Sequence, residues 1–356
     1  MNGDVPSSAR ALVIGAERRL TLVERALPAP RPGDVLVAIA GCAAGDAALL
    51  ALDLGPGGAC PGGALFGTVV AAPATERDLA PGRAVVVPAR LPCGACAACR
   101  HGRAEACPAP LPLLPGGLAS HAWVPAASAV PLAHGLERAA PLGWRLAAAG
   151  GPLLLAYHGL ARAGLMPGDV AVFLGLDATG LCGVQIAAAD GAVAFAVDDR
   201  EARLDTVRAQ GAQGCICSAE LDPAALAAAL DALAVEHGRA GARRLVVCRA
   251  TGTRGLARAV AAVPPGGSLL VLGRPPAGAA LDAAALAARA ALVVLVEEGH
   301  PDLLPECLAL CARGAVALEP LVRDCAFTAA DEALAALRAG DDAVVPIVRP
   351  VESATK

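Results

Sequence analysis

Residues 168–199, GDVAVFLGLDATGLCGVQIAAADGAVAFAVDD, decide the fold of this chain. The run VAVFLGL is short and continuously apolar, which is typical of a parallel strand that is buried on both faces. A segment of helix length follows it, and AVAFAVDD is a second apolar run. Strand, helix and strand in this order predict a βαβ unit of a doubly wound parallel sheet.

The flanking sequence separates into two kinds. Downstream, RRLVVCRA, SLLVLG and ALVVLVEEG are further apolar runs, and LDPAALAAALDALAVEHG reads as a helix with an Asp cap and a proline in its first turn. Up to about residue 147, short apolar runs such as ARALVIG and VLVAIAG alternate with Pro- and Gly-rich turns, which favours a barrel-like β domain. We therefore expect an α/β protein in which a β-barrel domain precedes a parallel-sheet domain.

The composition excludes several classes of protein. The chain has 356 residues of which 56% are hydrophobic, enough for two domains with sizeable cores. A net charge of −4 disfavours a nucleic-acid binder, and the absence of 18 consecutive uncharged apolar residues disfavours a membrane-spanning helix. The first residues, MNGDVPSSAR, do not form a secretory signal. With an odd count of 13 cysteines, these features favour a reducing cytoplasm over a disulfide framework.

Four of the cysteines form the strongest chemical motif. Cys93, Cys96, Cys99 and Cys107 are spaced C-x2-C-x2-C-x7-C. Four thiolates so close in sequence can converge on one tetrahedral ion, and soft sulfur selects zinc. The spacing differs from the common ferredoxin patterns, which disfavours an iron–sulfur cluster, and four free thiols on a loop would oxidise. A closed four-thiolate set leaves no open coordination position, so we predict one structural zinc ion in a lobe at about residues 90–110.

A dinucleotide fingerprint with one substitution follows the first strand of the parallel sheet. Its usual form is G-x-G-x-x-G, in which the second glycine lets the backbone approach the pyrophosphate and the helix N-terminus meets the negative charge. Here Asp177 stands at that second glycine, between Gly175 and Gly180. Its carboxylate either repels the pyrophosphate or caps the helix and competes for the same amides.

The nucleotide site would also use the end of the next strand. Asp198 stands 18 residues after Gly180, where an acid binds the ribose 2′-OH of NAD, and Arg203 follows it on the adjoining helix. The alternative for Asp198 is a plain helix N-cap. We predict a Rossmann-type domain with NAD as the candidate cofactor, held by a set of six residues: Gly175, Leu176, Gly180, Leu181, Asp198 and Arg203.

In this order the motifs resemble the zinc-dependent medium-chain alcohol dehydrogenases over nearly the whole chain. The matching pieces are PRPGDVLVAIAGC at 30–42, the cysteine quartet, GGLASHAWVP at 116–125, LMPGDVAVFLG at 165–175 and the terminal AVVPIVRP. The resemblance implies a GroES-like catalytic domain at 1–147, a Rossmann domain at 148–300 and a segment at 301–356 that returns to the catalytic domain. It also implies a dimer or a tetramer. The stretches GTRGLARAVAAVPPGGSLLVLG and HPDLLPECLALC look most like the 6-hydroxycyclohexenecarbonyl-CoA dehydrogenase branch, a hint of an acyl-thioester substrate.

The family's catalytic zinc lacks its ligands in this sequence. By resemblance, the three ligand positions fall on Gly45, Gly63 and Gly151. A one-residue gap would place Cys42 at the first position, but a single thiolate does not hold a catalytic zinc. In the family that ion polarises the alcohol oxygen so that hydride can leave for the nicotinamide.

Three other residues are candidates for proton transfer. Asp46 lies beside the lost site, and Tyr157 and His158 lie on the helix near the domain junction. Each has a structural alternative, namely a solvated or helix-capping carboxylate for Asp46 and ordinary packing and hydrogen bonding for Tyr157 and His158. We therefore carry two functions forward and assign no catalytic residue. One is a zinc-free NAD(P)-dependent oxidoreductase acting on a small alcohol, carbonyl or acyl-CoA-type substrate. The other is a catalytically inactive paralogue with a structural or partner-binding role.

Overall fold

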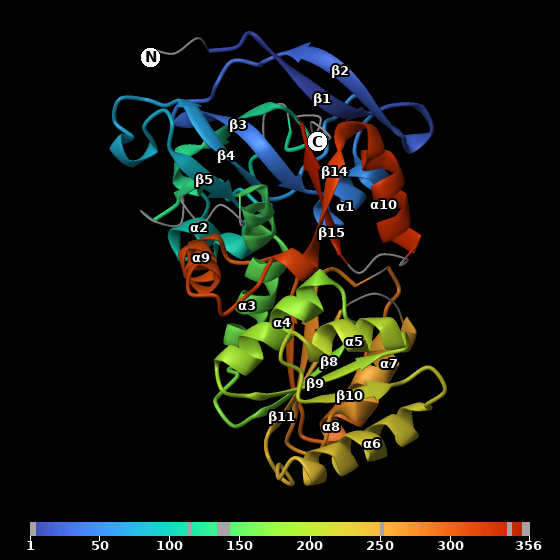
Figure 1. Cartoon of the computed structure of the whole chain (residues 1–356). Helices are drawn as coiled ribbons and strands as arrows, with labels where there is room; N and C mark the ends of the chain where they lie inside the picture. Colours follow the sequence, from blue (N-terminus) through green and yellow to red (C-terminus); the bar gives the residue numbers. More distant parts are fainter. Residues whose placement is uncertain are drawn as a thin grey trace. The chain divides into compact units, whose positions relative to one another are not determined.

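The computed structural model describes residues 5–112, 116–133, 143–249, 253–275, 277–339 and 344–350. The chain divides into two compact units. The first contains residues 1–154, 300–314 and 318–356, and the second contains residues 155–299 and 315–317. Figure 1 shows both units, with labels on those helices and strands for which there is room.

The second unit is built on a six-stranded parallel sheet in the order β10-β9-β8-β11-β12-β13. Its strands are β8 (Val170–Leu174), β9 (Val193–Asp198), β10 (Gly214–Cys217), β11 (Arg244–Arg249), β12 (Ser268–Leu272) and β13 (Leu292–Val296). The strand order reverses between β8 and β11. Strand β8 pairs in parallel with β9 on one side (Val170↔Val193) and with β11 on the other (Val170↔Arg244). A doubly wound sheet places its ligand site at the carboxyl ends of such a pair of strands.

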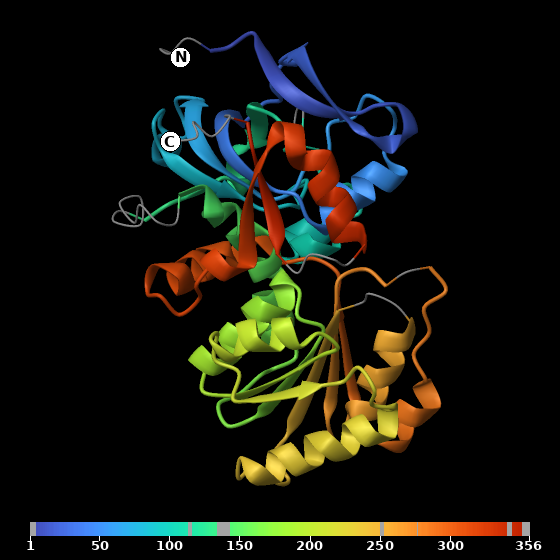
Figure 2. The same cartoon turned by 45° about the vertical axis from the view of Figure 1, so that its right-hand side comes forward.

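Helices cover both faces of this sheet (Figure 2). They are α4 (Ala178–Ala189), α5 (Glu201–Arg208), α6 (Pro223–Glu236), α7 (Thr253–Ala262) and α8 (Ala283–Ala288), while α3 (Pro152–Arg162) spans the point where the chain passes between units. Every residue of β8, β9, β11 and β12 is buried, as the continuous apolar runs predict. The predicted cap of α6 is also confirmed, since Asp222 Oδ1 accepts from Ala225 N at 2.8 Å and Pro223 opens the helix.

The first unit is mainly antiparallel. A hairpin of β1 (Ser8–Ile14) and β2 (Leu20–Ala26) accompanies a seven-stranded sheet in the order β14-β15-β3-β4-β5-β7, with β6 also paired to β3. These strands are β3 (Asp34–Ala43), β4 (Leu65–Ala71), β5 (Ala84–Val87), β6 (His121–Pro125), β7 (Val130–Pro131), β14 (Val322–Ala326) and β15 (Val345–Arg349). Ile347 of β15 pairs with Ala43 of β3, so strands from both ends of the chain share this sheet.

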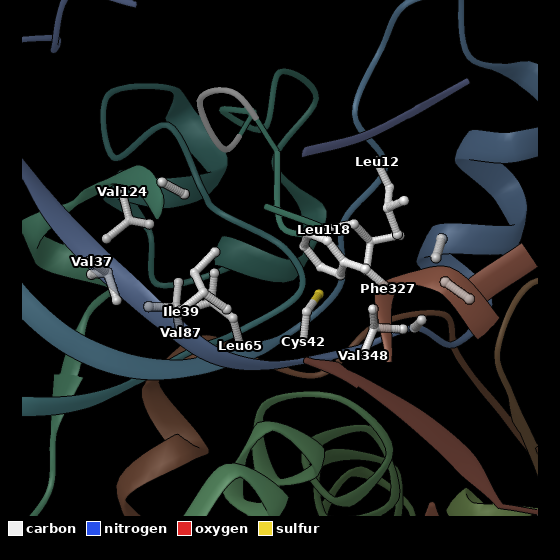
Figure 3. Packing of buried hydrophobic residues seen from close by; sticks show 14 of the residues in the cluster. Leu12, Val37, Ile39, Cys42, Leu65, Val87, Leu118, Val124, Phe327 and Val348 are labelled. Carbon is white, nitrogen blue, oxygen red and sulfur yellow. The ribbon is translucent and has the colours of Figure 1, made fainter. Parts of the chain in front are cut away.

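Short helices complete the first unit: α1 (Asp46–Leu54), α2 (Ala97–Arg100), the 3-10 helix η6 (Gly143–Gly150), α9 (Leu304–Ala312) and α10 (Ala330–Ala339). The apolar core lies between the strands and these helices. Figure 3 shows Cys42 pointing into it beside Leu118, Phe327 and Val348. The expectation of an α/β protein that joins a barrel-like β domain to a parallel-sheet domain is therefore confirmed. None of the described helices is both long and apolar enough to cross a membrane.

Candidate functional site

The four predicted zinc ligands come together in one lobe of the first unit. The Sγ atoms of Cys93, Cys96, Cys99 and Cys107 all lie within 4.8 Å of one another. Two of the separations, Cys93 to Cys99 and Cys96 to Cys107, are 4.0 Å each. Zinc–sulfur bonds of about 2.3 Å put the sulfurs of a tetrahedral site roughly 3.8 Å apart, so the cluster is close to the geometry that zinc requires. In the described part of the chain it is the one group of three or more candidate ligands.

The local backbone explains why the lobe takes this shape. Cys96 caps α2, where its Sγ accepts from Cys99 N at 3.4 Å, and Cys107 Sγ accepts from Cys93 N at the same distance. Hydrogen bonds from the backbone amides of Ala95 and Cys96 lower the pKa of Cys93 to about 6. Desolvation raises the pKa of Cys99 to about 12, and a bound cation would favour the thiolate there as well. The residues present therefore fit a structural zinc ion, which would crosslink the lobe.

His300 ties this lobe to the C-terminal part of the same unit. Its Nε2 lies 3.0 Å from the carbonyl oxygen of Gly102 and 3.4 Å from Oε2 of Glu105. The ring also caps the following 3-10 helix, since Nδ1 accepts from Asp302 N at 3.3 Å. Sequence spacing gave His300 no role, because its partners lie almost 200 residues away along the chain.

Gly45, Gly63 and Gly151, the glycines that the resemblance places at the family's catalytic-zinc ligand positions, have different surroundings. A Cβ at Gly63 would lie 1.9 Å from the carbonyl oxygen of Ala43, whereas one at Gly151 would meet its nearest atom, Ala64 Cβ, at 3.7 Å. A Cβ at Gly45 meets nothing within 4 Å. A side chain at position 63 would therefore require this backbone to shift, and the glycines at the three positions offer no side-chain ligand to a metal ion.

The thiol nearest to these glycines belongs to the core. Cys42 is 1% exposed, and burial raises the pKa of its thiol from 9.0 to about 12. Cys60, which the sequence did not single out, is also largely buried with a pKa of about 12, raised by the same cause. Both thiols are neutral at physiological pH. Neutral buried thiols are poor metal ligands and poor nucleophiles, so Cys42 has the properties of an apolar core residue.

The candidates for proton transfer are arranged as follows. Asp46 is exposed at the first turn of α1. His158 is 4% exposed, and its Nδ1 lies 2.9 Å from the carbonyl oxygen of Glu298. Tyr157 is half-buried on the same helix. The hydrogen bond of His158 fits the structural role that we weighed for it.

The carboxyl ends of β8, β9 and β11 bring the predicted nucleotide residues together. Gly175 adopts a φ of +89°, which a glycine tolerates without strain. At Gly180 a Cβ would lie 2.4 Å from the carbonyl oxygen of Gly175, so this close approach also requires glycine. Leu176 and Leu181 are buried beside them. The turn therefore has the tight strand-to-helix geometry of a dinucleotide fingerprint.

Both carboxylate oxygens of Asp198 accept hydrogen bonds from backbone amides of the protein itself. Its Oδ2 accepts from Leu176 N and its Oδ1 from Arg200 N, both at 3.0 Å, while Arg203 Nη1 lies 3.6 Å away. The side chain is 3% exposed, and desolvation raises its pKa in spite of these donors. Asp198 is not the N-cap of α5, since Arg200 occupies that position. The carboxylate links the fingerprint turn to the start of α5.

Asp177 caps α4, which is one of the two alternatives from the sequence. Its Oδ1 accepts from Thr179 N and Gly180 N at 3.0 Å each, and its Oδ2 accepts from Arg249 Nε at 2.7 Å. Arg249 ends β11 and is a residue that sequence reasoning missed, because its partner lies 72 positions earlier. The amides that would receive a pyrophosphate are already satisfied by a carboxylate. In this arrangement the turn does not fit a dinucleotide unless Asp177 moves.

Comparisons with known proteins agree with this architecture. Residues 31–134 match the alcohol dehydrogenase GroES-like domain. Benzyl alcohol dehydrogenase from Acinetobacter calcoaceticus superimposes with a TM-score of 0.82 at 22% identity over 97% of this chain and 100% of its own. Acetophenone reductase from Geotrichum candidum, solved with NAD, gives 0.80 at 23% identity over 98% of both chains. A zinc-binding dehydrogenase from Sinorhizobium meliloti, bound to NADP, gives 0.81 at 22% identity over 97% of this chain and 100% of its own.

These similarities define the class of the fold. The chain has a GroES-like alcohol dehydrogenase domain and the overall fold of the medium-chain alcohol dehydrogenases. The fold that the resemblance predicts from the sequence is therefore confirmed.

Proposed function

We propose that this protein is an alcohol dehydrogenase-like, NAD(P)-dependent oxidoreductase that works without a catalytic zinc. The observation that carries the proposal is the backbone at Gly63, where any side chain would lie on the carbonyl oxygen of Ala43 at 1.9 Å. The nucleotide residues at the carboxyl edge of the parallel sheet support the oxidoreductase part, as does the binding of NAD and NADP that two similar structures record. The proposed substrates are small molecules with a carbonyl or enoyl group, including acyl thioesters.

The lack of a catalytic metal restricts the chemistry. In this fold class a nicotinamide dinucleotide supplies or accepts the hydride. Hydride transfer to a carbonyl and hydride loss from the alcohol pass through the same alkoxide-like transition state, so both directions need a group that stabilises the oxygen or exchanges a proton with it. The three glycines have no side chain that could do so. We therefore infer that another side chain or a water molecule exchanges this proton in either direction.

The sulfur cluster has a separate, structural role in this proposal. One zinc ion on Cys93, Cys96, Cys99 and Cys107 would hold the lobe at about residues 90–110, next to the His300 contact with Gly102. We propose the domain roles in the same way: residues 1–147 with 301–356 on the substrate side, and 148–300 on the nucleotide side. The high number of cysteines that are not joined in disulfide bonds favours a reducing compartment, the cytoplasm.

A homo-oligomer is proposed from the edge of the parallel sheet. Among the described strands β13 pairs with β12 alone, which leaves one side of its backbone open. Leu292 and Leu295 on this strand are 54% and 59% exposed. The unpaired backbone groups of such an apolar edge strand can form hydrogen bonds with a strand of another chain. A second copy of the protein fits it, because a two-fold contact would pair β13 with itself.

The second candidate is a catalytically inactive paralogue. The hydrogen bonds from Thr179 and Gly180 to Asp177 favour it, because they occupy the amides that a cofactor phosphate would use. The two candidates make different predictions for the wild-type protein: an oxidoreductase binds the cofactor, and the inactive paralogue does not.

Calorimetric titration of the wild-type protein with NADH and NADPH, followed by assays with a panel of small ketones, enones and acyl thioesters, tests the proposal. Micromolar binding with turnover would support it, and turnover should survive in Cys42→Ala, because this core thiol takes no part. No binding at millimolar cofactor would favour the inactive paralogue. Turnover that required a second equivalent of metal would contradict the zinc-free proposal.

A further inference from the structure

Asp177 and Arg249 form an ion pair across the carboxyl edge of the parallel sheet. The pair joins the N-terminus of α4 to the end of β11, the strand beside β8. The guanidinium side chain is 8% exposed, while the carboxylate side chain is 31% exposed. Burying a guanidinium without an anionic partner destabilises the folded protein. Asp177 therefore has two roles, because it neutralises Arg249 and also caps the helix.

The surroundings of Arg249 are shaped to hold its guanidinium. Gly273, directly after β12, has a φ of +86°, and a Cβ there would lie 2.9 Å from Nη1 of Arg249. The arginine thus lies against bare backbone on one side and the Asp177 carboxylate on the other. The Asp177 carboxylate is held by the two α4 amides and by Arg249, but its side chain is 31% exposed, so water can reach it as it leaves these donors.

The donors around the Asp177 carboxylate are those that bind a phosphate. Two helix-terminal amides and a guanidinium surround its oxygens, and the same combination recognises phosphate groups in proteins. A carboxylate on the same chain competes with a dissolved phosphate at high effective concentration. Displacement requires the half-buried Asp177 side chain to rotate and to give up its three hydrogen bonds, which the phosphate oxygens would replace, and Arg249 would then face the incoming anion.

We propose that the Asp177–Arg249 pair is a latch that closes the phosphate subsite of the nucleotide crevice, so that a dinucleotide binds only by displacing Asp177 from Arg249 and from the α4 amides. This inference rests on the proposed function, because it regulates the same nucleotide site. The latch sets the affinity for the cofactor, and Arg249 becomes a phosphate-binding residue once it opens.

The test measures affinity for inorganic pyrophosphate and for NADPH by calorimetry in Asp177→Gly and in the wild-type protein. We expect Asp177→Gly to bind both probes at least tenfold more tightly, since the carboxylate no longer competes with them for the two amides and for the Arg249 guanidinium. Adding Arg249→Gln to Asp177→Gly should abolish most of this gain. Asp222→Gly, which removes the single-amide cap of α6, is the matched control and should leave both affinities unchanged.

The outcomes separate the latch from the proposed function. Equal pyrophosphate affinity in the wild type and in Asp177→Gly would overturn the latch, whether or not NADPH binds. Strong NADPH binding by the wild type with no gain in the variant would keep the oxidoreductase and reject the latch. Binding by the variant alone would support the latch and favour the inactive paralogue. If Asp177→Gly unfolds, Asp177→Asn keeps a cap oxygen but loses the charge, and it should still bind more tightly than the wild type; equal affinity would reject the latch.

Discussion

Replacing Gly63 by alanine tests the steric argument against a catalytic metal. Gly63 and Ala43 are both buried, and the new Cβ would lie 1.9 Å from the Ala43 carbonyl oxygen. Real Cβ contacts are 3.0 Å or longer, so the two segments must separate by about 1.1 Å. The shift would stretch the hydrogen bond from Ala43 N to Ala64 O, now 2.8 Å, and the pairing of Ala43 with Ile347.

The magnitude follows from two costs. Overpacking a buried site costs about 1–3 kcal/mol, and a buried hydrogen bond that is left unmade costs about 1–3 kcal/mol. Gly63→Ala should therefore lower the free energy of unfolding by about 2–6 kcal/mol, a large part of the usual total of about 5–15 kcal/mol. The midpoint of thermal unfolding should fall by roughly 5–15 °C.

The assay is thermal and urea unfolding followed by circular dichroism, with Gly151→Ala as the matched control. The control places its Cβ 3.7 Å from the nearest atom, an ordinary contact, so its stability should stay within about 0.5 kcal/mol of the wild type. A Gly63→Ala protein as stable as Gly151→Ala would refute the reasoning. It would also mean that a histidine could be accommodated at position 63.

Three further predictions concern the metal, the core thiols and the sheet edge. Cys107→Ser should release the zinc and lower the unfolding temperature by roughly 10 °C, since binding of a structural zinc contributes about 10 kcal/mol or more; retention of the metal, measured with a colorimetric chelator, would contradict the assigned ligands. Burial raises the pKa of Cys42 from 9.0 to about 12, so the folded protein keeps a proton that the unfolded chain releases, and the free energy of unfolding should fall between pH 9 and 12 by up to about 1.4 kcal/mol per pH unit for this thiol. Urea unfolding of Cys42→Ala should show a shallower decline, and an identical slope would count against this origin. Leu295→Lys on β13 should shift the protein to smaller species in sedimentation velocity, and an unchanged sedimentation coefficient would contradict an interface at this edge.

The sequence predicted those features that depend on neighbours along the chain. The runs around β8 and β9 are apolar because both faces of the parallel sheet are buried, and the observed strands fall within one or two residues of them. The apolar runs RRLVVCRA and SLLVLG likewise contain β11 and β12. The cysteine quartet converges because its members lie within 15 residues of one another, so local turns suffice to bring them together.

Contacts between distant segments could not be predicted in the same way. The order of strands in the antiparallel sheet depends on pairing of β15 with β3, which no local pattern encodes. Arg249 reads as the end of an apolar strand, and its role depends on which strand lies next to β8. The clash at Gly63 depends on the path of Ala43, where the sequence revealed only that a ligand was missing.

The metal content of the purified protein tests the central claim most directly. Elemental analysis of wild-type protein prepared without chelators should give one zinc per chain, and that zinc should disappear in Cys107→Ser. Two zinc ions per chain, one of which survives in Cys107→Ser, would show that the protein carries a second metal centre and would contradict the account.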